Sequence, residues 1–328
     1  MSFSLNMMFD EQKQELRVYF NHRLKVLPDL SLYPNLLILD CSEHQLTSLD
    51  NLPHTLQELW CSHNQLTSLD NLPPNLRELW CYNNQLTSLN NLPPNLQELH
   101  CSNNQLTSLE NLPSTLQTLN CENNQLGVRG IWTMFLSGFA HLNNLPPNLQ
   151  VLVCSGNQFT RLGGAEDNFP LTLRVLHCGN NKLTSLDNLP PNLQDLWCGN
   201  NLLTSIKYLP PNLQTLHCYG NKLTSLDNLP PNLRGLLCSY NQLTSLDNLP
   251  SNLRILHCSS NQIVMIEGEE FDFDNLPLTL QEFNCNGNPI YYTYKKTYGI
   301  ELSTETMKQH NKARHIANLE KECCPMLK

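Results

Sequence analysis

A block of 20 residues recurs along most of this 328-residue chain. Residues 66–81 read LTSLDNLPPNLRELWC, residues 86–101 read LTSLNNLPPNLQELHC, and residues 223–238 read LTSLDNLPPNLRGLLC. A single block of this length cannot bury its own apolar face, so the period predicts units that are stabilised by stacking on their neighbours. The period is marked by two series of cysteines spaced 20 residues apart: Cys41, Cys61, Cys81, Cys101 and Cys121, then Cys178, Cys198, Cys218, Cys238 and Cys258.

Each unit contains an alternating segment that predicts a short strand. In one unit, Leu79 and Cys81 alternate with Glu78 and Trp80, which is typical of a strand with one buried face. Stacking the units in register gives a parallel sheet with leucine and cysteine inward. The return leg of most units carries a Pro-Pro pair such as Pro93-Pro94, which favours an extended chain there.

Asparagine occupies the ninth position of almost every unit. An amide supplies both a donor and an acceptor, so a stack of asparagines can satisfy backbone groups where each strand turns away. His44 takes the position in the first unit, where one neighbour is missing. The asparagines are Asn64, Asn84, Asn104, Asn124, Asn157, Asn181, Asn201, Asn221, Asn241, Asn261 and Asn288.

The unit LPPNLQELHCSNNQLTSL (92–109) closely resembles the short leucine-rich repeats of bacterial effector proteins that are injected into host cells. Its cysteine at position six, the Asp-Asn before Leu-Pro and the ending Asn288-Pro289-Ile290 also resemble leucine-rich repeat proteins of giant DNA viruses such as the mimiviruses. The resemblance covers residues 27–292. It implies an α/β-type repeat solenoid: a leucine-rich repeat horseshoe with a parallel β-sheet on the concave face, an extended polyproline-like convex side and short helical caps.

The repeat divides the chain into three parts. Residues 1–30 do not repeat, and Asp10 is placed to cap a helix that runs to about Leu24, which predicts an N-terminal helical cap. Residues 31–292 form the solenoid of about 12 units. Residues 293–328 form a C-terminal cap and tail, in which Ser303 is a good N-cap for a polar helix.

Three insertions interrupt the period, near 127–142, 163–167 and 267–274. The first is apolar and aromatic, and we expect a short helix on the convex side; a projecting hydrophobic loop for a partner is the alternative. The second breaks the proline pattern. The third is acidic and aromatic, and we expect a solvated turn, with a small docking site as the alternative.

Composition argues against several partner classes. The net charge is -9, the sequence pI is about 5.6 and there is no run of Lys or Arg, so the footprint of a nucleic-acid binder is missing. No apolar stretch approaches the ~18 residues of a membrane span, and the N-terminus lacks the features of a signal peptide. We therefore expect a cytoplasmic monomer. The resemblance adds the host-cell cytoplasm and the virion as locations.

The cysteines favour packing over chemistry. Twelve of the fourteen stand at the sixth repeat position or its equivalent, where in-register side chains run parallel and cannot form disulfides; we expect buried free thiols. Cys323 and Cys324 lie outside the repeats, in what we expect to be a frayed tail, and reactive thiols are the alternative.

Neither a metal site nor catalysis is predicted. There are no CxxC pairs, and His177, His217 and His257 are each separated by two strands, roughly 9–10 Å, which is too far for a shared metal. No nucleophile–base set, Walker loop or GxGxxG is present. We therefore expect no enzyme activity and no cofactor.

The concave face carries the candidate site. The third and fifth positions of every strand project there together, and three of the four tryptophans share the fifth column. Exposed tryptophan and tyrosine are typical of binding surfaces, although duplication alone can also copy them. An aromatic row beside an acidic one suggests a partner with apolar and basic groups. The candidate residues are Glu58, Trp60, Glu78, Trp80, Tyr82, Glu98, His100, His177, Trp197, His217, Tyr219, Tyr240 and His257.

These features favour a non-enzymatic scaffold that binds a protein or peptide on its concave face. The resemblance implies a viral or bacterial factor that acts on host proteins. A substrate-recruiting component of a ubiquitin-ligase pathway and a structural virion protein are the alternatives. Some bacterial relatives carry a C-terminal ubiquitin-ligase domain with a catalytic cysteine. Only residues 293–328 follow the last unit, so we expect that domain to be absent and do not assign its role to Cys323 or Cys324.

Overall fold

A computed structural model of the chain divides into two compact units, Met1–Lys182 (unit 1) and Leu183–Lys328 (unit 2), which are described in turn. The expected insertions at 163–167 and 267–274, the interior of the one at 127–142, and Cys323 and Cys324 fall outside the described residues. The structure describes residues 6–10, 15–19, 24–127, 142, 145–162, 169–264, 276–298, 301, 303–306 and 308–309.

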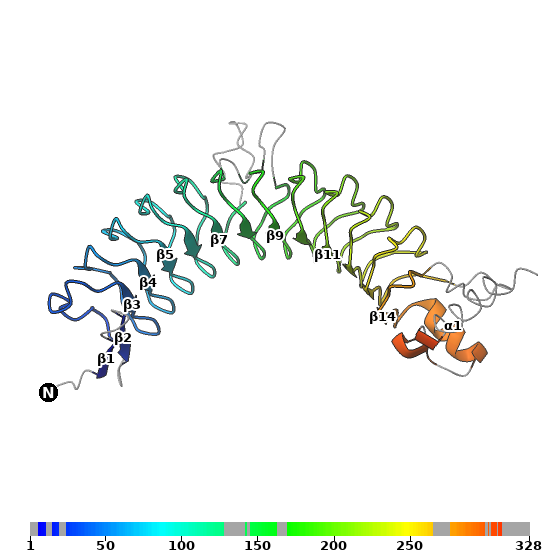
Figure 1. Ribbon diagram of the computed structural model, residues 1–328, viewed down its shortest axis with the longest axis horizontal. Coiled ribbons are helices and arrows are strands. Elements are labelled where there is room, and N and C mark those ends of the chain that lie inside the picture. Colours follow the sequence, from blue (N-terminus) through cyan, green and yellow to red (C-terminus); the bar gives the residue numbers. More distant parts are fainter. Residues whose placement is uncertain are drawn as a thin grey trace, which may run out of the picture. The chain divides into compact units, whose positions relative to one another are not determined.

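In unit 1, each repeat contributes one short strand that pairs in parallel with the strand of the next repeat (Figure 1). The register aligns the central leucines, so that Leu59 lies opposite Leu39 and Leu79 lies opposite Leu59. The strands are β3 (Ile38–Asp40), β4 (Glu58–Trp60), β5 (Glu78–Trp80), β6 (Glu98–His100), β7 (Thr118–Asn120), β8 (Val151–Val153) and β9 (Val175–His177).

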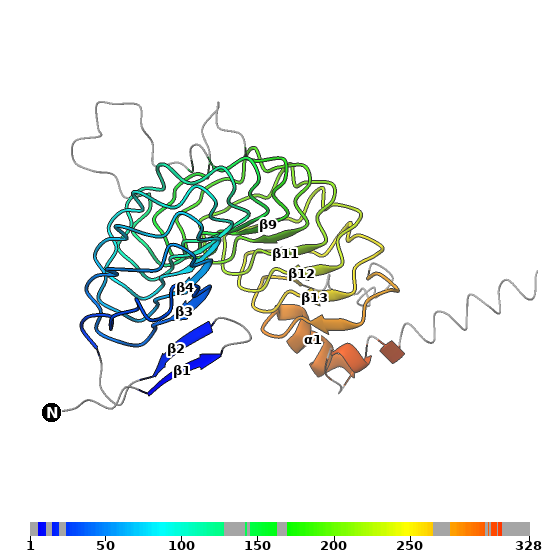
Figure 2. The same cartoon turned by 60° about the vertical axis from the view of Figure 1, so that its left-hand side comes forward.

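The predicted N-terminal helix is wrong. Strands β1 (Asn6–Asp10) and β2 (Glu15–Tyr19) form an antiparallel hairpin, and β2 pairs in parallel with β3. Figure 2 shows the hairpin continuing the sheet beyond β3. The reason is that β3 would otherwise expose a row of unpaired backbone donors and acceptors. A strand satisfies these groups directly, whereas a helix bonds only to itself and leaves them bare.

Unit 2 repeats the same plan and ends in a helix. Its strands also pair in parallel and in register, and helix α1 lies beside β14 (Figures 1 and 2). Together the two units confirm the predicted leucine-rich repeat fold, with one strand per repeat and little helix. The elements are β10 (Asp195–Trp197), β11 (Thr215–His217), β12 (Gly235–Leu237), β13 (Ile255–His257), β14 (Glu282–Asn284) and α1 (Pro289–Tyr298).

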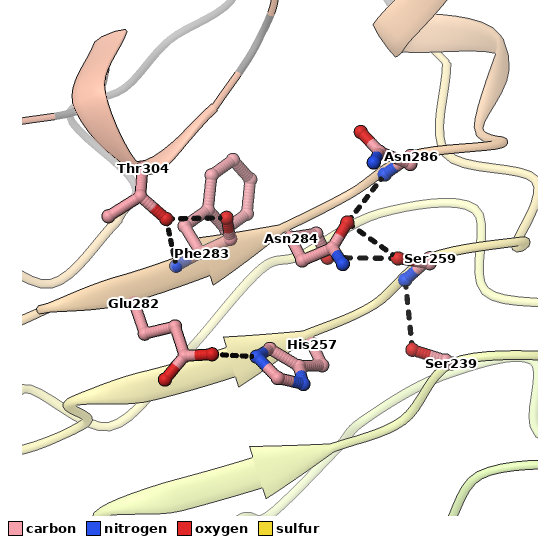
Figure 3. Close-up of polar contacts among 8 residues, drawn as sticks. All are labelled: Ser239, His257, Ser259, Glu282, Phe283, Asn284, Asn286 and Thr304. Carbon is pink, nitrogen blue, oxygen red and sulfur yellow. Dashed lines mark hydrogen bonds and ion pairs between the residues drawn. The ribbon is translucent and has the colours of Figure 1, made fainter.

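The C-terminal cap begins earlier than expected and closes the edge of β14. Helix α1 starts at Pro289, and its face toward the sheet buries Tyr294, which is 8% exposed. Beyond it, the Thr304 hydroxyl accepts a bond from the Phe283 backbone N–H at 3.0 Å and donates to the Phe283 carbonyl at 2.9 Å (Figure 3). The backbone N–H of Thr306 donates to the Ser303 Oγ at 3.3 Å, which is the N-cap bond expected for that serine.

The core consists of repeated columns of leucine and cysteine. In each regular repeat three leucines and one cysteine are fully buried. In one repeat these residues are Leu76, Leu79, Cys81 and Leu86, each 0% exposed. All twelve described cysteines are free and buried, as predicted. Because every repeat buries the same residues against the next one, burial is gained only across the junctions between repeats.

The ninth-position asparagines form the expected hydrogen-bond ladder. The Asn104 side-chain NH₂ donates to the carbonyls of Cys81, Cys101 and Ser102 at 3.0, 3.1 and 3.2 Å. Its Oδ1 accepts a bond from the Leu86 N–H at 2.9 Å. One buried amide therefore closes the turn after its own strand and also connects that turn to the previous repeat.

A second set of asparagines, not anticipated from the sequence, occupies left-handed backbone positions. In one repeat these are Asn71 (φ 60°) and Asn83 (φ 54°). The same two positions are left-handed in other repeats of unit 1 and unit 2. Asparagine tolerates this conformation better than most residues. The Asp-Asn dipeptide before Leu-Pro and the doubled Asn83-Asn84 therefore favour the two sharp bends in the repeats that carry them.

The buried thiols should resist alkylation. Burial raises the pKa of Cys81, Cys178 and Cys218 to about 12, so raising the pH to about 8.5 should produce almost no thiolate, which is the reactive form. We expect peptide mass spectrometry to find these cysteines unmodified by iodoacetamide in the native protein and fully modified in urea. Equal rates in both conditions would contradict the burial of the ladder.

Candidate functional site

The predicted concave residues lie on one face of the short strands. In β4, β5 and β6 the central leucine is buried, and the residues on either side of it are half-buried on the opposite, open face of the sheet. The third-position and fifth-position side chains therefore form two parallel rows that cross successive strands.

In unit 1 the fifth-position residues of β4, β5 and β6 form a series of adjacent rings. The ring centroids of Trp60 and Trp80 lie 6.1 Å apart at 48°, and those of Trp80 and His100 lie 4.3 Å apart at 31°. Tyr82 lies 6.4 Å from Trp80 and makes an edge contact with His63 at 5.2 Å. Apart from the slightly closer Trp80–His100 pair, these separations fall within the range of favourable aromatic pairs, so the rings support one another as a preformed apolar surface.

The third-position row of unit 1 places three carboxylates side by side. Glu58, Glu78 and Glu98 occupy matching register positions on β4, β5 and β6. Partial burial, with added repulsion from Glu58 and Glu98, raises the pKa of Glu78. Beside this row, burial lowers the pKa of His100, although Glu98 lies 3.8 Å away and acts in the opposite direction. The surface thus combines concentrated negative charge with neutral rings.

The row of like charges should cost stability at neutral pH. The fold raises the pKa of Glu78 above its ordinary value of 4.5, so the folded state favours the protonated acid, and stability is lost as the pH rises through the folded pKa. Replacing Glu78 with Gln should therefore stabilise the protein at pH 7 by about 0.2–0.5 kcal/mol.

Urea unfolding at pH 7 and pH 4 tests this expectation, with the exposed Glu110→Gln substitution on a return leg as the control. The gain from Glu78→Gln should shrink at pH 4, where the wild-type acid is protonated. An equal gain from Glu110→Gln would assign the effect to net charge instead of the row.

In unit 2 the fifth-position row contains a more nearly parallel ring pair. Trp197 stacks on His217 with centroids 4.3 Å apart and planes at 15°. Tyr219 lies over Gly199, where an added Cβ would approach the tyrosine ring to 2.6 Å. Gly199 was not among the predicted residues. The sequence signal for it is the Cys198-Gly199 pair, because most repeats carry a larger residue after the cysteine.

His257 belongs to a polar network at the end of the sheet. Its Nε2 lies 2.7 Å from the Glu282 Oε1 across the β13–β14 junction (Figure 3). Nearby, the Ser259 hydroxyl donates to the Asn284 Oδ1 at 2.8 Å, and the Asn286 N–H donates to the same oxygen at 3.2 Å. Glu282 was not among the predicted residues, although it holds the same third position as Glu58.

Two predicted residues lie apart from these clusters. His177 lies half-buried on β9 in unit 1, where its register neighbour on β8 is Val153. Tyr240 is not on a strand: it occupies a left-handed turn position with φ 56° and is 67% exposed. Tyr240 was predicted to lie on the concave face with Tyr219. However, Tyr240 is two residues after its cysteine, whereas Tyr219 is one residue after its cysteine.

The arrangement is suited to contact with another molecule. Within the described ranges, no three His, Cys, Asp or Glu side chains gather as a possible metal site. The side chains of the open face offer flat rings, carboxylates and imidazoles spread across several strands. Such a surface can bind a ligand at many points without a central pocket.

Comparisons with known proteins agree with this architecture. The family model described as "Leucine Rich repeats (2 copies)" matches residues 54–94, 147–191, 171–211 and 191–231. The structure also matches YopM, a leucine-rich effector protein from Yersinia pestis, with TM-score 0.69 and 30% identity over 86% of this chain and 80% of that one. The chain belongs to the leucine-rich repeat family. Its short repeats are of the bacterial-effector type.

Two further structures resemble this leucine-rich repeat chain. YopM from Yersinia enterocolitica WA-314 gives TM-score 0.65 and 32% identity over 82% of this chain, which spans 59% of that one. The functional domain of InlJ from Listeria monocytogenes, which includes a cysteine ladder, gives TM-score 0.59 and 25% identity over 85% of this chain and 64% of that one. A search of curated proteins finds no match.

The leucine-rich repeat scaffold is of a type that commonly binds other proteins. None of the helices in the described part has the length and hydrophobicity needed to cross a bilayer.

Proposed function

We propose that this protein is a non-enzymatic interaction scaffold that binds a protein or peptide through the open face of its repeat sheet. The observation that carries the proposal is the ring row of Trp60, Trp80 and His100 on adjacent strands. Tryptophan and tyrosine contribute much of the binding energy at protein interfaces because they bury large rigid surfaces. A row of supported rings has already lost most of the rotamer freedom that binding would remove.

The acidic row beside the rings indicates the chemistry of the partner. Glu58, Glu78 and Glu98 repel one another, and a cationic group between them would relieve that repulsion. Lys or Arg can also contact an indole face through a cation–π interaction. We therefore propose a partner segment that presents apolar and basic side chains together.

The likeness to the YopM effectors supports a finer proposal, in which the partner is a host protein met by a bacterial or viral factor. In this proposal the chain acts as a cytoplasmic monomer.

The test is an affinity capture from candidate host lysate with the wild type and two variants. Trp60→Ala/Trp80→Ala removes the rings, and Glu58→Lys/Glu98→Lys reverses the charge with little change in packing. Tyr208→Ala removes a tyrosine that is 86% exposed on a return leg and serves as the matched control. Circular dichroism is the control that each variant is folded.

We expect a partner that is captured by the wild type and by Tyr208→Ala and is lost from both open-face variants. Loss from the Trp variant alone would keep the aromatic site and remove the basic partner chemistry. A partner retained by both open-face variants would contradict the proposal.

A further inference from the structure

The residue that immediately precedes each strand belongs to a second row of side chains. This row lies at the start of the strands instead of on the open face of the sheet. This position is occupied by glutamine or arginine in all but one of the described repeats and by an acid in none. In unit 2 two arginines of this row, Arg234 and Arg254, lie on adjacent repeats. The Arg254 backbone N–H donates to the Arg234 carbonyl at 2.8 Å. Repeats stacked in this way bring equivalent side chains to about 4.8 Å spacing.

These arginines line an open groove of about 390 Å³ that runs across the repeats of unit 2. The remaining lining is uncharged and includes Gln214, Asn232 and Asn252. The amide N–H groups of Asn232 and Asn252 donate to the carbonyls of Pro211 and Pro231 at 3.3 and 3.1 Å. These bonds fix the wall of the groove, and the glutamine amides are left available at its surface.

No carboxylate neutralises the two arginines within the described part of the chain. Both side chains are exposed, and neither forms an ion pair there. Glu282, whose backbone N–H donates to the Arg254 carbonyl, pairs its carboxylate with His257 instead. The groove is thus a local concentration of positive charge on a chain whose net charge is -9.

We propose that this groove binds an extended acidic segment of a partner protein. Guanidinium groups bind carboxylates through paired charge-assisted hydrogen bonds. Acidic side chains two residues apart on an extended peptide face the same way, and two such carboxylates can meet Arg234 and Arg254. Glutamine amides supply both donors and acceptors for the backbone of that peptide.

The size and charge of the groove favour a peptide over other anions. A free phosphate needs convergent donors at one point, whereas this groove spreads its polar groups over several repeats. Nucleic acid binding depends on neutralising many phosphates, and only two cations are present here. The groove is also separate from the ring row, so this inference does not depend on the proposed function.

Fluorescence anisotropy with the full chain tests the proposal. The probe is a labelled 12-residue peptide of alternating Glu and Ser, compared with a Lys-Ser peptide and a single-stranded oligonucleotide of matched charge, with inorganic phosphate as competitor. The test variant is Arg234→Gln/Arg254→Gln, and its fold is safe because Gln194 and Gln214 hold the same position. Lys207→Gln/Lys222→Gln removes equal charge from exposed return-leg and turn positions of unit 2.

We expect the acidic peptide to bind the wild type and to bind the arginine variant about tenfold more weakly. The lysine variant should differ less than twofold, and Gln194→Arg/Gln214→Arg should strengthen binding. Trp60→Ala/Trp80→Ala should leave the affinity unchanged. The proposal is overturned by absent wild-type binding, by equal weakening in the lysine variant, by an equal arginine dependence for the oligonucleotide, or by displacement with millimolar phosphate.

Discussion

Replacing Asn104 with alanine should destabilise unit 1 by about 3–5 kcal/mol, because it removes four hydrogen bonds and leaves the buried Leu86 N–H without an acceptor. The Leu86 N–H loses its acceptor, and the carbonyls of Cys81 and Cys101 each lose one of two asparagine donors, keeping those from Asn84 and Asn124. Asn104 is only 8% exposed. Because these bonds connect two repeats, the effect should extend beyond the mutated repeat.

Urea unfolding followed by circular dichroism measures this loss. The neighbouring Gln105→Ala is the matched control, since Gln105 is exposed and makes no side-chain bond among the described residues; its cost should stay within about 0.5 kcal/mol. Asn104→Asp is a second comparison that keeps the acceptor and removes the donors. If Asn104→Ala costs no more than Gln105→Ala, the ladder is not a major source of stability.

The second large effect is expected at the centre of a strand in unit 2. Leu216 is fully buried and lies between Leu196 and Leu236 on the neighbouring strands. Replacing it with alanine should cost about 3–5 kcal/mol through lost burial and the cavity left behind. Thr215→Ala, one residue earlier on the half-buried open face, should cost less than about 1 kcal/mol.

Thermal and urea unfolding of both variants checks this difference. Leu216→Met, which keeps most of the volume, should recover most of the lost stability. Equal losses for Leu216→Ala and Thr215→Ala would mean that the two faces of the sheet are not distinguished as the structure shows.

The repeated part of the fold could be predicted from the sequence because its determinants are local and recur. The alternation of Leu79 and Cys81 with Glu78 and Trp80 is enough to assign the buried and open faces, and the structure confirms both. The same period also gives the neighbours within a row. It therefore predicts that Trp197 lies beside His217, as the stacked rings show.

The ends of the solenoid could not be predicted in this way because they are determined by partners distant in sequence. The segment after Asp10 has a plausible helical pattern, yet the open edge of β3 recruits the N-terminal segment as strands. The pairing of His257 with Glu282 depends on strand register that is kept across a longer interval between two repeats. A usable signal did exist for α1, because proline is favoured at the first position of a helix, and Pro289 stands there.

The asparagine ladder also has a consequence for how such a gene can change. Every junction between regular repeats uses the same bonds, from one amide to the carbonyls on both sides and from one N–H of the previous repeat. A duplicated or deleted block of 20 codons therefore rejoins a junction that already fits. Loss of a single codon within a block shifts the asparagine away from its carbonyls and turns leucine toward solvent. Recombination between repeats should thus vary the length of the protein in whole blocks, while the spacing inside each block stays under selection.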